Sequence, residues 1–505
     1  MLASVLTLFA VVINGYHPGA DDGGLYMAGV KRLLDPSLYP HATAFVLEPM
    51  RHSFFAPTVA AVVRLSHIGL PIILLALHLL SIWATLFAAW MLASRCWTRR
   101  TARAGAVVLL ACWLALPVAG TALMMMDPYA TARSLATPVM VLALVGALDM
   151  TAAGSTQRRG FLLWAVSLAL AATMHPLMAA YALGATLMLL AARTPNRTTR
   201  LYATAALAAS ALVLAACLQA HAKPESAECI RIAWTRTYWF PAQWRWYELL
   251  GLAAPLAILS LFAHRKLSKP PLDESTQFIR SRRALARMAV AVGATACLVA
   301  FLCARTASAS YPVARLQPLR AFQVVYLVLI LALGAKLGER VLQRLPWRWA
   351  LAMLLLGGIM LGAERTAFPH SNHLELPGSV PRNQWTQAFL WVRDNTPKDA
   401  LFALDADYIN APGEDAQCFR AIAERSALPD YSKDGGEASI APELATEWTS
   451  SQAAQQHLSA PQATDPQRLA ALRPLGVSWV ILQAGATTHF DCPYTNAAVK
   501  VCRLR

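Results

Sequence analysis

Long apolar runs, separated by short polar segments, fill the chain from its start to residue 363. A stretch of about 20 apolar residues can cross a membrane as a helix, so the pattern predicts a mainly α-helical polytopic membrane protein with about 11 transmembrane helices. The predicted helices are 2–15, 70–93, 104–124, 135–150, 160–173, 177–192, 201–219, 248–263, 288–304, 321–335 and 349–363.

The first of these runs, 2–15, is short for a membrane span. No basic segment precedes it and no small-residue cleavage site follows it, which argues against a signal peptide. We expect a first span whose cytoplasmic start is missing from the sequence. The helical run 56–68, which contains Arg64 and His67, is expected to lie at the membrane surface.

After residue 363 the pattern changes to a mixed polar sequence with short, β-prone apolar runs. Such runs predict strands, and amphipathic stretches between them predict helices. The expected elements are strands at 400–404, 477–482 and 499–504 and helices at 384–395 and 417–425. The sequence therefore predicts a transmembrane domain, 1–363, followed by a small α/β domain, 364–505.

Composition supports a membrane protein. Hydrophobic residues make up 57% of the 505 residues and charged residues only 14%, whereas soluble domains carry roughly 25% charged residues. The net charge of +16 does not indicate a nucleic-acid partner, because no basic stripe with interleaved aromatic residues occurs. Lys and Arg gather instead in short segments between the apolar runs.

The basic segments also predict the orientation of the chain. Cytoplasmic loops carry an excess of Lys and Arg, which places 95–103 in the cytoplasm. The N-terminus is then cytoplasmic, and the first loop, 16–55, lies with the C-terminal domain on the outer face of the inner (plasma) membrane. In that compartment Cys492 and Cys502 can form a disulfide.

Ionisable chemistry is concentrated in the first loop, where Asp21 and Asp22 are adjacent. A carboxylate there can act as a general base toward a hydroxyl or amine, or can hold a divalent cation. Gly23 and Gly24, which follow, let the backbone approach a ligand closely. The alternative is a solvated loop start with a flexible Gly-Gly turn, and for an acidic pair alone that alternative is favoured.

A second acidic motif, Asp127-Pro128-Tyr129 with Arg133, lies in another predicted outside loop. It faces the same compartment as Asp21, so the two motifs can converge on one cavity. The alternative is structural, with Asp127 as a helix N-cap before Pro128 at the first helical position.

A third group consists of Arg315, Gln317 and Arg320 in an outside loop next to a predicted span. Arginines in such a place can bind a phosphate or pyrophosphate, or they can be side chains that snorkel at a helix end. His175, before Pro176, is expected to be a local structural feature and alternatively to line the site.

Four acids of the C-terminal domain offer no spacing that demands catalysis, and we expect them on a solvated surface. They are Asp405, Asp407, Glu414 and Asp415. The chain has no Walker A loop, no G-x-S-x-G and no H-E-x-x-H. It therefore lacks the usual signatures of an ATPase, a serine hydrolase or a zinc protease.

The first-loop sequence ADDGGLYMAGVKRLLDPSLYP resembles the acidic first loop of the GT-C superfamily of membrane glycosyltransferases, and DPYATARS resembles a second acidic loop of that superfamily. Positions that fill the first pattern are Asp21 or Asp22, Tyr26, Ala28, Leu33, Leu34 and Tyr39. More narrowly, the chain is similar to an uncharacterised bacterial group, through the HP turn at His175, the segment QPLR, and WVRDNTPKDALF, AERSALPD and CPYTN in the tail.

The resemblance implies transfer of a sugar from a polyprenyl-phosphate donor to a glycan, lipid or protein acceptor on the extracytoplasmic face. Asp21 or Asp22 would be the base or a metal ligand and Asp127 the second acid, with Mg²⁺ or Mn²⁺ as possible cation and no nucleotide cofactor. The implied substrate-binding residues are Tyr26, Tyr129, Arg133, His175, Arg315, Gln317 and Arg320.

Two other functions remain open. A transporter of lipid-linked sugars predicts ionisable residues inside spans and symmetry between two halves, and the sequence offers few of the first and no evident sign of the second. A non-catalytic assembly or scaffold protein of the envelope, with the same fold, would tolerate the loss of all three acids.

Overall fold

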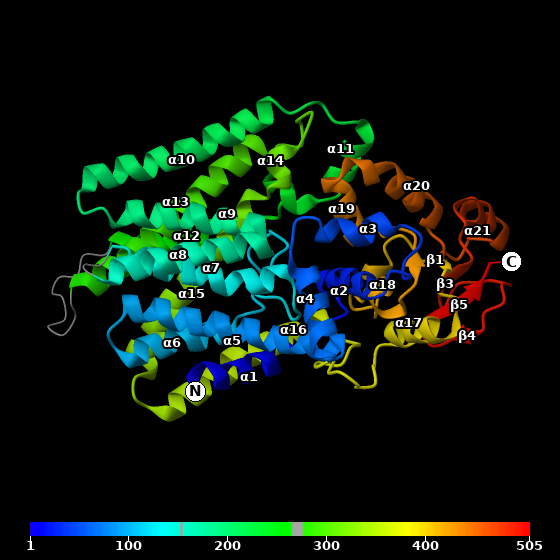
Figure 1. Ribbon diagram of the computed structural model, residues 1–505, viewed down its shortest axis with the longest axis horizontal. Helices are drawn as coiled ribbons and strands as arrows, with labels where there is room; N and C mark the ends of the chain where they lie inside the picture. Colours follow the sequence, from blue (N-terminus) through cyan, green and yellow to red (C-terminus); the bar gives the residue numbers. More distant parts are fainter. Residues whose placement is uncertain (152–154, 265–275, 505) are drawn as a thin grey trace.

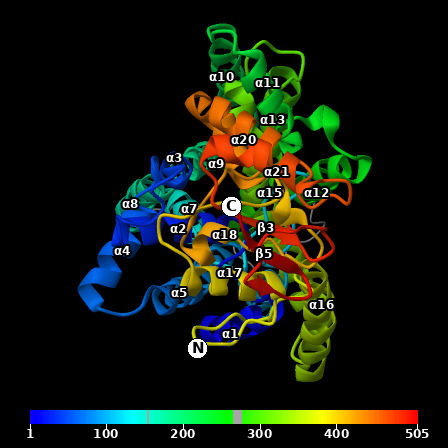
Figure 2. The same ribbon diagram turned by 90° about the vertical axis from the view of Figure 1, so that its right-hand side faces the viewer.

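The computed structural model describes residues 1–151, 155–264 and 276–504. Long helices lie side by side along the molecule, and the C-terminal helices and strands form a smaller body at one end (Figure 1). Seen from that end, the C-terminal sheet lies in front of the long helices (Figure 2). The chain is a polytopic, mainly helical membrane protein with a small C-terminal sheet region, as predicted.

Within the described ranges, eight helices are long and apolar enough to cross a membrane. They are α5 (Leu70–Cys96), α7 (Ala132–Asp149), α9 (Pro176–Arg193), α10 (Arg197–Ala220), α12 (Trp246–His264), α13 (Thr276–Cys303), the stretch Pro312–Leu342 with α14 (Pro312–Arg315) and α15 (Phe322–Leu337), and α16 (Pro346–Ala367). Other helices of this part include α1 (Leu2–Asn14), α4 (Phe55–Ser66), α8 (Ser155–Met174) and α11 (Ala227–Trp234). The predicted number of spans remains a prediction.

The predicted span 104–124 is wrong in its second half, because α6 (Arg100–Cys112) ends early. The loop that follows contains Pro117, which lacks the N–H that a helix needs. It also packs tightly: a Cβ at Gly120 would lie 2.8 Å from the Trp244 ring. This irregular loop carries the second acidic motif toward α7.

The C-terminal sheet has five strands in the order β2-β1-β3-β5-β4, with β1 parallel to both β2 and β3 and the remaining pairs antiparallel. The strands are β1 (Leu401–Ala403), β2 (Ser426–Ala427), β3 (Trp479–Gln483), β4 (Tyr494–Thr495) and β5 (Val499–Arg503). The helices are α17 (Gln384–Asn395), α18 (Phe419–Ala423), α19 (Lys433–Ile440), α20 (Ala445–Gln455) and α21 (Asp465–Leu472). Each strand and helix expected here has a counterpart, and Cys492 and Cys502 form the predicted disulfide.

Two of the four acids expected on a solvated surface are buried, so that expectation is wrong for them. Glu414 has no exposed surface and Asp415 is 8% exposed. Asp415 accepts the backbone N–H groups of His370 and Ser371, and Glu414 accepts that of Gln417. These acids organise turns inside the C-terminal region rather than facing water.

The first loop joins the long helices to the C-terminal region. Its main helix, α2 (Asp21–Leu34), packs against α18, and a short helix, α3 (Thr43–Leu47), follows it. The Tyr39 hydroxyl, fully buried, donates to the Arg420 carbonyl, and Lys31 forms an ion pair with Glu424. The C-terminal region is therefore docked on the loop that carries the first acidic motif, while α16 runs on past the predicted boundary at 363/364, which stays a prediction.

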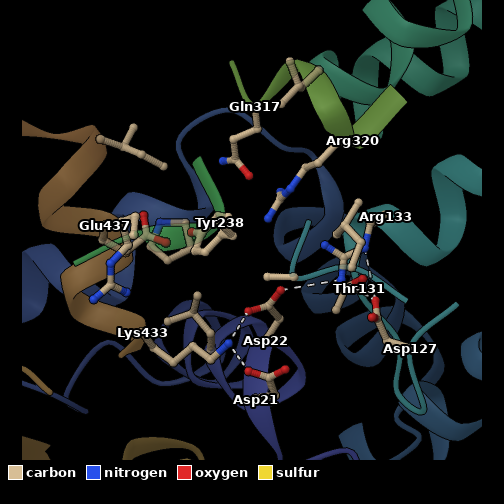
Figure 3. A pocket seen from close by; sticks show the side chains of 18 of the residues that line it. Asp21, Asp22, Asp127, Thr131, Arg133, Tyr238, Gln317, Arg320, Lys433 and Glu437 are labelled. Atoms are coloured by element: carbon tan, nitrogen blue, oxygen red, sulfur yellow. Dashed lines mark hydrogen bonds and ion pairs between the residues drawn. The ribbon is translucent and has the colours of Figure 1, made fainter. Parts of the chain in front are cut away.

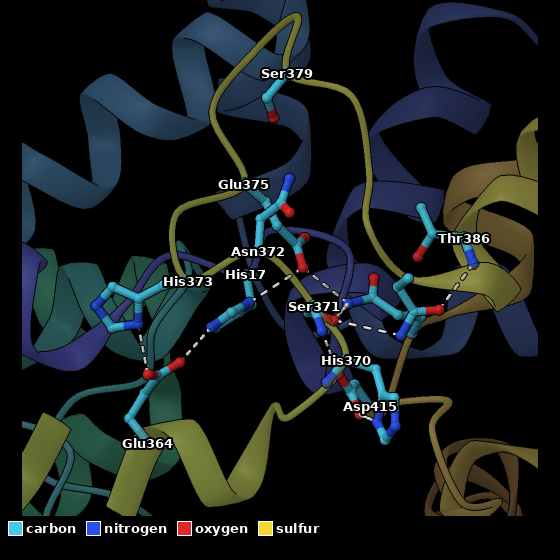
Figure 4. A network of polar contacts seen from close by, with 12 residues as sticks. His17, Glu364, His370, Ser371, Asn372, His373, Glu375, Ser379, Thr386 and Asp415 are labelled. Atoms are coloured by element: carbon cyan, nitrogen blue, oxygen red, sulfur yellow. Dashed lines mark hydrogen bonds and ion pairs between the residues drawn. The ribbon is translucent and has the colours of Figure 1, made fainter. Parts of the chain in front are cut away.

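A buried polar network holds the same junction from the other side (Figure 4). His17 donates or accepts at both ring nitrogens, 2.7 Å from Glu364 Oε1 and 3.1 Å from Glu375 Oε1. Its ring stacks on Phe368, and the second Glu364 oxygen pairs with His373. Burial alone would lower the pKa of His17, but the two carboxylates outweigh it and raise that pKa above its usual value.

Candidate active site

One cavity of ≈ 1020 Å³ lies where the first loop, the loop before α7, the start of the Pro312–Leu342 stretch and α19 meet (Figure 3). All ten residues singled out in the sequence line it. They are Asp21, Asp22, Tyr26, Asp127, Tyr129, Arg133, His175, Arg315, Gln317 and Arg320. Residues that are far apart in sequence thus line one cavity.

The two first-loop acids open helix α2, where the partial positive charge of a helix N-terminus favours carboxylates. Their side chains remain accessible, 41% exposed for Asp21 and 31% for Asp22. A Cβ at Gly23 would lie 2.7 Å from the Tyr129 ring, and one at Gly24 would lie 2.2 Å from Cys418 Cβ. Because Gly23 and Gly24 lack side chains, Tyr129 and Cys418 can pack closely against α2. The interpretations of the two glycines as a place of ligand approach or as a flexible turn are therefore wrong.

A lysine from the C-terminal region binds both acids. The Lys433 ammonium contacts Asp21 Oδ1 and lies 2.9 Å from Asp22 Oδ1. The second Asp21 oxygen accepts a 3.0 Å hydrogen bond from the Tyr129 hydroxyl. Burial lowers the pKa of Lys433 to about 8, with nearby Glu437 acting in the opposite direction.

Lys433 was missed in the sequence. The only signal was a single basic residue in the segment YSKDGGE, between two acids of the C-terminal region. Tyr238 and Glu437, which also line the cavity, were not predicted as site residues either. The amino-acid sequence contains no pattern that predicts a contact between these segments and the first loop.

The third acid, Asp127, is buried and tied to an arginine. Arg133 donates to Asp127 Oδ2 through Nη2 at 2.5 Å and Nε at 3.2 Å, and its Nη2 lies 3.6 Å from Asp22 Oδ2. Burial raises the pKa of Asp127, although Arg133 opposes this. The interpretation as an N-cap is wrong, because α7 begins with a capping box made by Thr131 and Ser134.

The two predicted phosphate-binding arginines differ sharply. Arg315 forms a bidentate ion pair with Glu225, at 2.6 and 2.7 Å, and donates to the Ser439 carbonyl. Arg320 lies over the Tyr238 ring and points into the cavity toward Asp22 (Figure 3). In the described part of the chain, its Nε has no hydrogen-bond partner. Of the two arginines, Arg320 is therefore the one whose N–H donors are available to bind an anion.

The remaining predicted residues shape the walls. His175 caps α9 by accepting the Met178 N–H, which agrees with a local structural role, and it also faces the cavity. Tyr26 packs edge-on against Phe55. Gln317 adopts a left-handed backbone conformation, and its Oε1 is buried without a partner among the described residues.

The acids do not fit a divalent cation in this arrangement. Among the described residues, no cluster of three His, Cys, Asp or Glu side chains could hold a metal ion. Asp21 and Asp22 share the Lys433 ammonium, and Asp127 is turned toward Arg133. A cation bridging the acids would have to displace one of these basic groups.

No family model and no curated protein matches the chain. Among solved structures, it is similar to the oligosaccharyltransferase AglB from Archaeoglobus fulgidus in complex with an inhibitory peptide and a dolichol-phosphate, at 12% identity and a TM-score of 0.46 over 96% of this chain and 69% of that one. The arabinofuranosyltransferase AftD from Mycobacteria matches at 16% identity and a TM-score of 0.49. These structure neighbours are GT-C glycosyltransferases.

The match to AftD covers 99% of this chain but only 41% of AftD. A second AglB structure, a complex with Zn and sulfate, matches at 12% identity and a TM-score of 0.38. At this level of similarity these structures support no inference about the activity of this chain.

Proposed function

We propose that the protein is an integral membrane glycosyltransferase that moves a sugar from a polyprenyl-phosphate donor to a glycan, lipid or protein acceptor. In this proposal residues 1–363 form the transmembrane domain and 364–505 an extracytoplasmic domain, in the inner membrane with a cytoplasmic N-terminus. The observation that supports it most is the pairing, across one cavity, of an uncommitted arginine, Arg320, with two accessible carboxylates, Asp21 and Asp22.

Arg320 is suited to hold the donor phosphate. A guanidinium binds phosphate oxygens with two parallel hydrogen bonds, and the cation–π contact with Tyr238 holds this one without consuming its donors. Arg133 lies near Arg320 in the cavity (Figure 3), so both arginines would stabilise the charge that develops on the departing phosphate. Apolar wall residues such as Leu25, Leu177 and Leu316 are suited to the first units of an isoprenoid chain.

Asp22 is better placed than Asp21 to act as general base. Both Asp21 oxygens are engaged, one by Lys433 and one by the Tyr129 hydroxyl. Asp22 Oδ2 faces the cavity, and among the described residues it has only a 3.6 Å contact with Arg133. The acceptor hydroxyl would give its proton to Asp22 as its oxygen bonds to the anomeric carbon, and the bond from that carbon to the phosphate oxygen would break with its electrons leaving on the lipid phosphate.

The test is transfer from a radiolabelled polyprenyl-phosphate sugar by the full chain in membranes, compared between wild type, Asp22→Asn and Asp21→Asn. Asp399→Asn, an exposed aspartate away from the cavity, is the matched control. Loss of transfer with Asp22→Asn, and retention with the control, supports the proposal. A scaffold protein would give no transfer in any sample, and wild-type activity in both first-loop variants would remove the assigned base.

A further inference from the structure

Lys433 is the one contact that the C-terminal region makes to both first-loop acids among the described residues. Its side chain is 19% exposed, and its ammonium lies between Asp21 and Asp22, as Figure 3 shows. A primary ammonium has three donors. Two are used by the acids, and the third is left for the cavity.

This position is where a cation bridging the two carboxylates would be bound. Two adjacent carboxylates repel each other, and a positive charge between them offsets that repulsion. A divalent cation and an ammonium cannot share that space, because their like charges repel at contact distance. In the structure, the Lys433 ammonium supplies this positive charge.

The lysine is held by a buried network rather than by a mobile surface loop. Asp430 Oδ1 accepts the Lys433 backbone N–H at 2.6 Å, and Asp434 accepts the Asp430 N–H at 2.7 Å. Arg420 fixes Asp434 through both carboxylate oxygens, and all three of these side chains are buried. Such a network orients the ammonium before any substrate arrives.

We propose that Lys433 is the resident cation of this site, takes the place of a divalent metal between Asp21 and Asp22, and makes the C-terminal region an integral part of the active site. This inference rests on the proposed function for its catalytic consequence. Lys433 balances the charge of the two acids and holds them in place, so that transfer proceeds without added metal.

The test uses the detergent-solubilised full chain and Mn²⁺ as probe, followed by the electron paramagnetic resonance signal of free Mn²⁺. Wild type is expected to bind no Mn²⁺ at micromolar concentrations, and its transfer activity to survive EDTA. Lys433→Ala opens the space between the acids, so it is expected to gain one Mn²⁺ site. A second change, Asp22→Asn, should remove that site, and loss of the Lys433 charge should lower transfer about 100-fold in EDTA.

Lys398→Ala is the matched control. Lys398 pairs with Asp35 at 3.3 Å and so joins the same two parts of the chain, but it lies outside the cavity. It should gain no Mn²⁺ site and keep wild-type transfer. Tight Mn²⁺ binding by wild type, with transfer abolished by EDTA, would overturn the inference and leave the proposed glycosyl transfer intact. Absence of transfer under every condition would count against the proposed function, and the Mn²⁺ binding of wild type would still decide the role of Lys433.

Discussion

Arg320 lies over the face of Tyr238, with its guanidinium carbon 5.8 Å from the ring centroid. The ring attracts the cation without accepting a hydrogen bond in the plane of the guanidinium. Arg320 is thereby held in the cavity while its donors stay available to an anion. This relationship is the basis for assigning Arg320, rather than Arg315, to the donor phosphate.

Replacing Arg320 by Gln should lower kcat/KM for the lipid-linked donor by about 100-fold, because it removes a charged donor from a site where negative charge develops. Thermal stability should change little, since Arg320 Nε has no hydrogen-bond partner among the described residues. Steady-state transfer assays and a melting curve on the same preparation check both parts. A variant with normal kcat/KM would show that the phosphate binds elsewhere.

Replacing Arg315 by Gln should lower stability more than it lowers transfer activity. Its bidentate partner Glu225 is 12% exposed and would lose its counter-charge. We expect a loss of about 1–3 kcal/mol in the free energy of unfolding and a smaller effect on transfer than in Arg320→Gln. Chemical denaturation of the purified chain measures the first effect; unchanged stability would contradict the structural role given to this pair.

Gly24 tests how the first loop meets the C-terminal region. A Cβ there would lie 2.2 Å from Cys418 Cβ and 2.5 Å from the Gly19 carbonyl oxygen. Gly24→Ala should therefore push α2 away from α18 and destabilise the chain, by about 1–3 kcal/mol for overpacking. Limited proteolysis between the long helices and the C-terminal region should become faster. A cleavage rate equal to that of wild type would show that α2 and α18 accommodate the added methyl group without destabilisation.

The sequence predicts the polar motifs of the cavity because ionisable residues are few in the predicted outside loops of this hydrophobic chain. Asp21, Asp127 and Arg320 are therefore conspicuous in those loops. It also predicts β1, β3 and β5 from short β-prone runs. Lys433 could not be found in this way, because its contact with Asp22 depends on tertiary docking between segments at the two ends of the chain. The early end of α6 at Cys112 was missed since an apolar run gives the same hydropathy signal whether it forms a helix or an irregular loop.

The junction at His17 should depend on pH. The folded-state pKa of His17 is raised by its bonds to Glu364 and Glu375, so the charged form stabilises the fold. That stabilisation is fully present below the unfolded value of 6.5 and is lost as pH rises through the higher folded value. The melting temperature of wild type should therefore fall toward that of His17→Gln as pH rises.

His373 shares Glu364 and also has a raised pKa, so His373→Gln serves as the companion variant in this series. The measurement is the difference in melting temperature between wild type and each variant across neutral pH. A difference that grows as pH rises would mean that His17 is held neutral in the folded chain, contrary to this account.

In the proposed mechanism, Asp22 removes the proton from the acceptor hydroxyl. The most direct measurement is single-turnover transfer from a radiolabelled polyprenyl-phosphate sugar by Asp22→Asn, which keeps the shape and removes the charge. We predict a rate reduced by about 10²–10⁴-fold, as for loss of a general base, with donor binding retained and Asp399→Asn at the wild-type rate. A wild-type rate for Asp22→Asn would contradict the account.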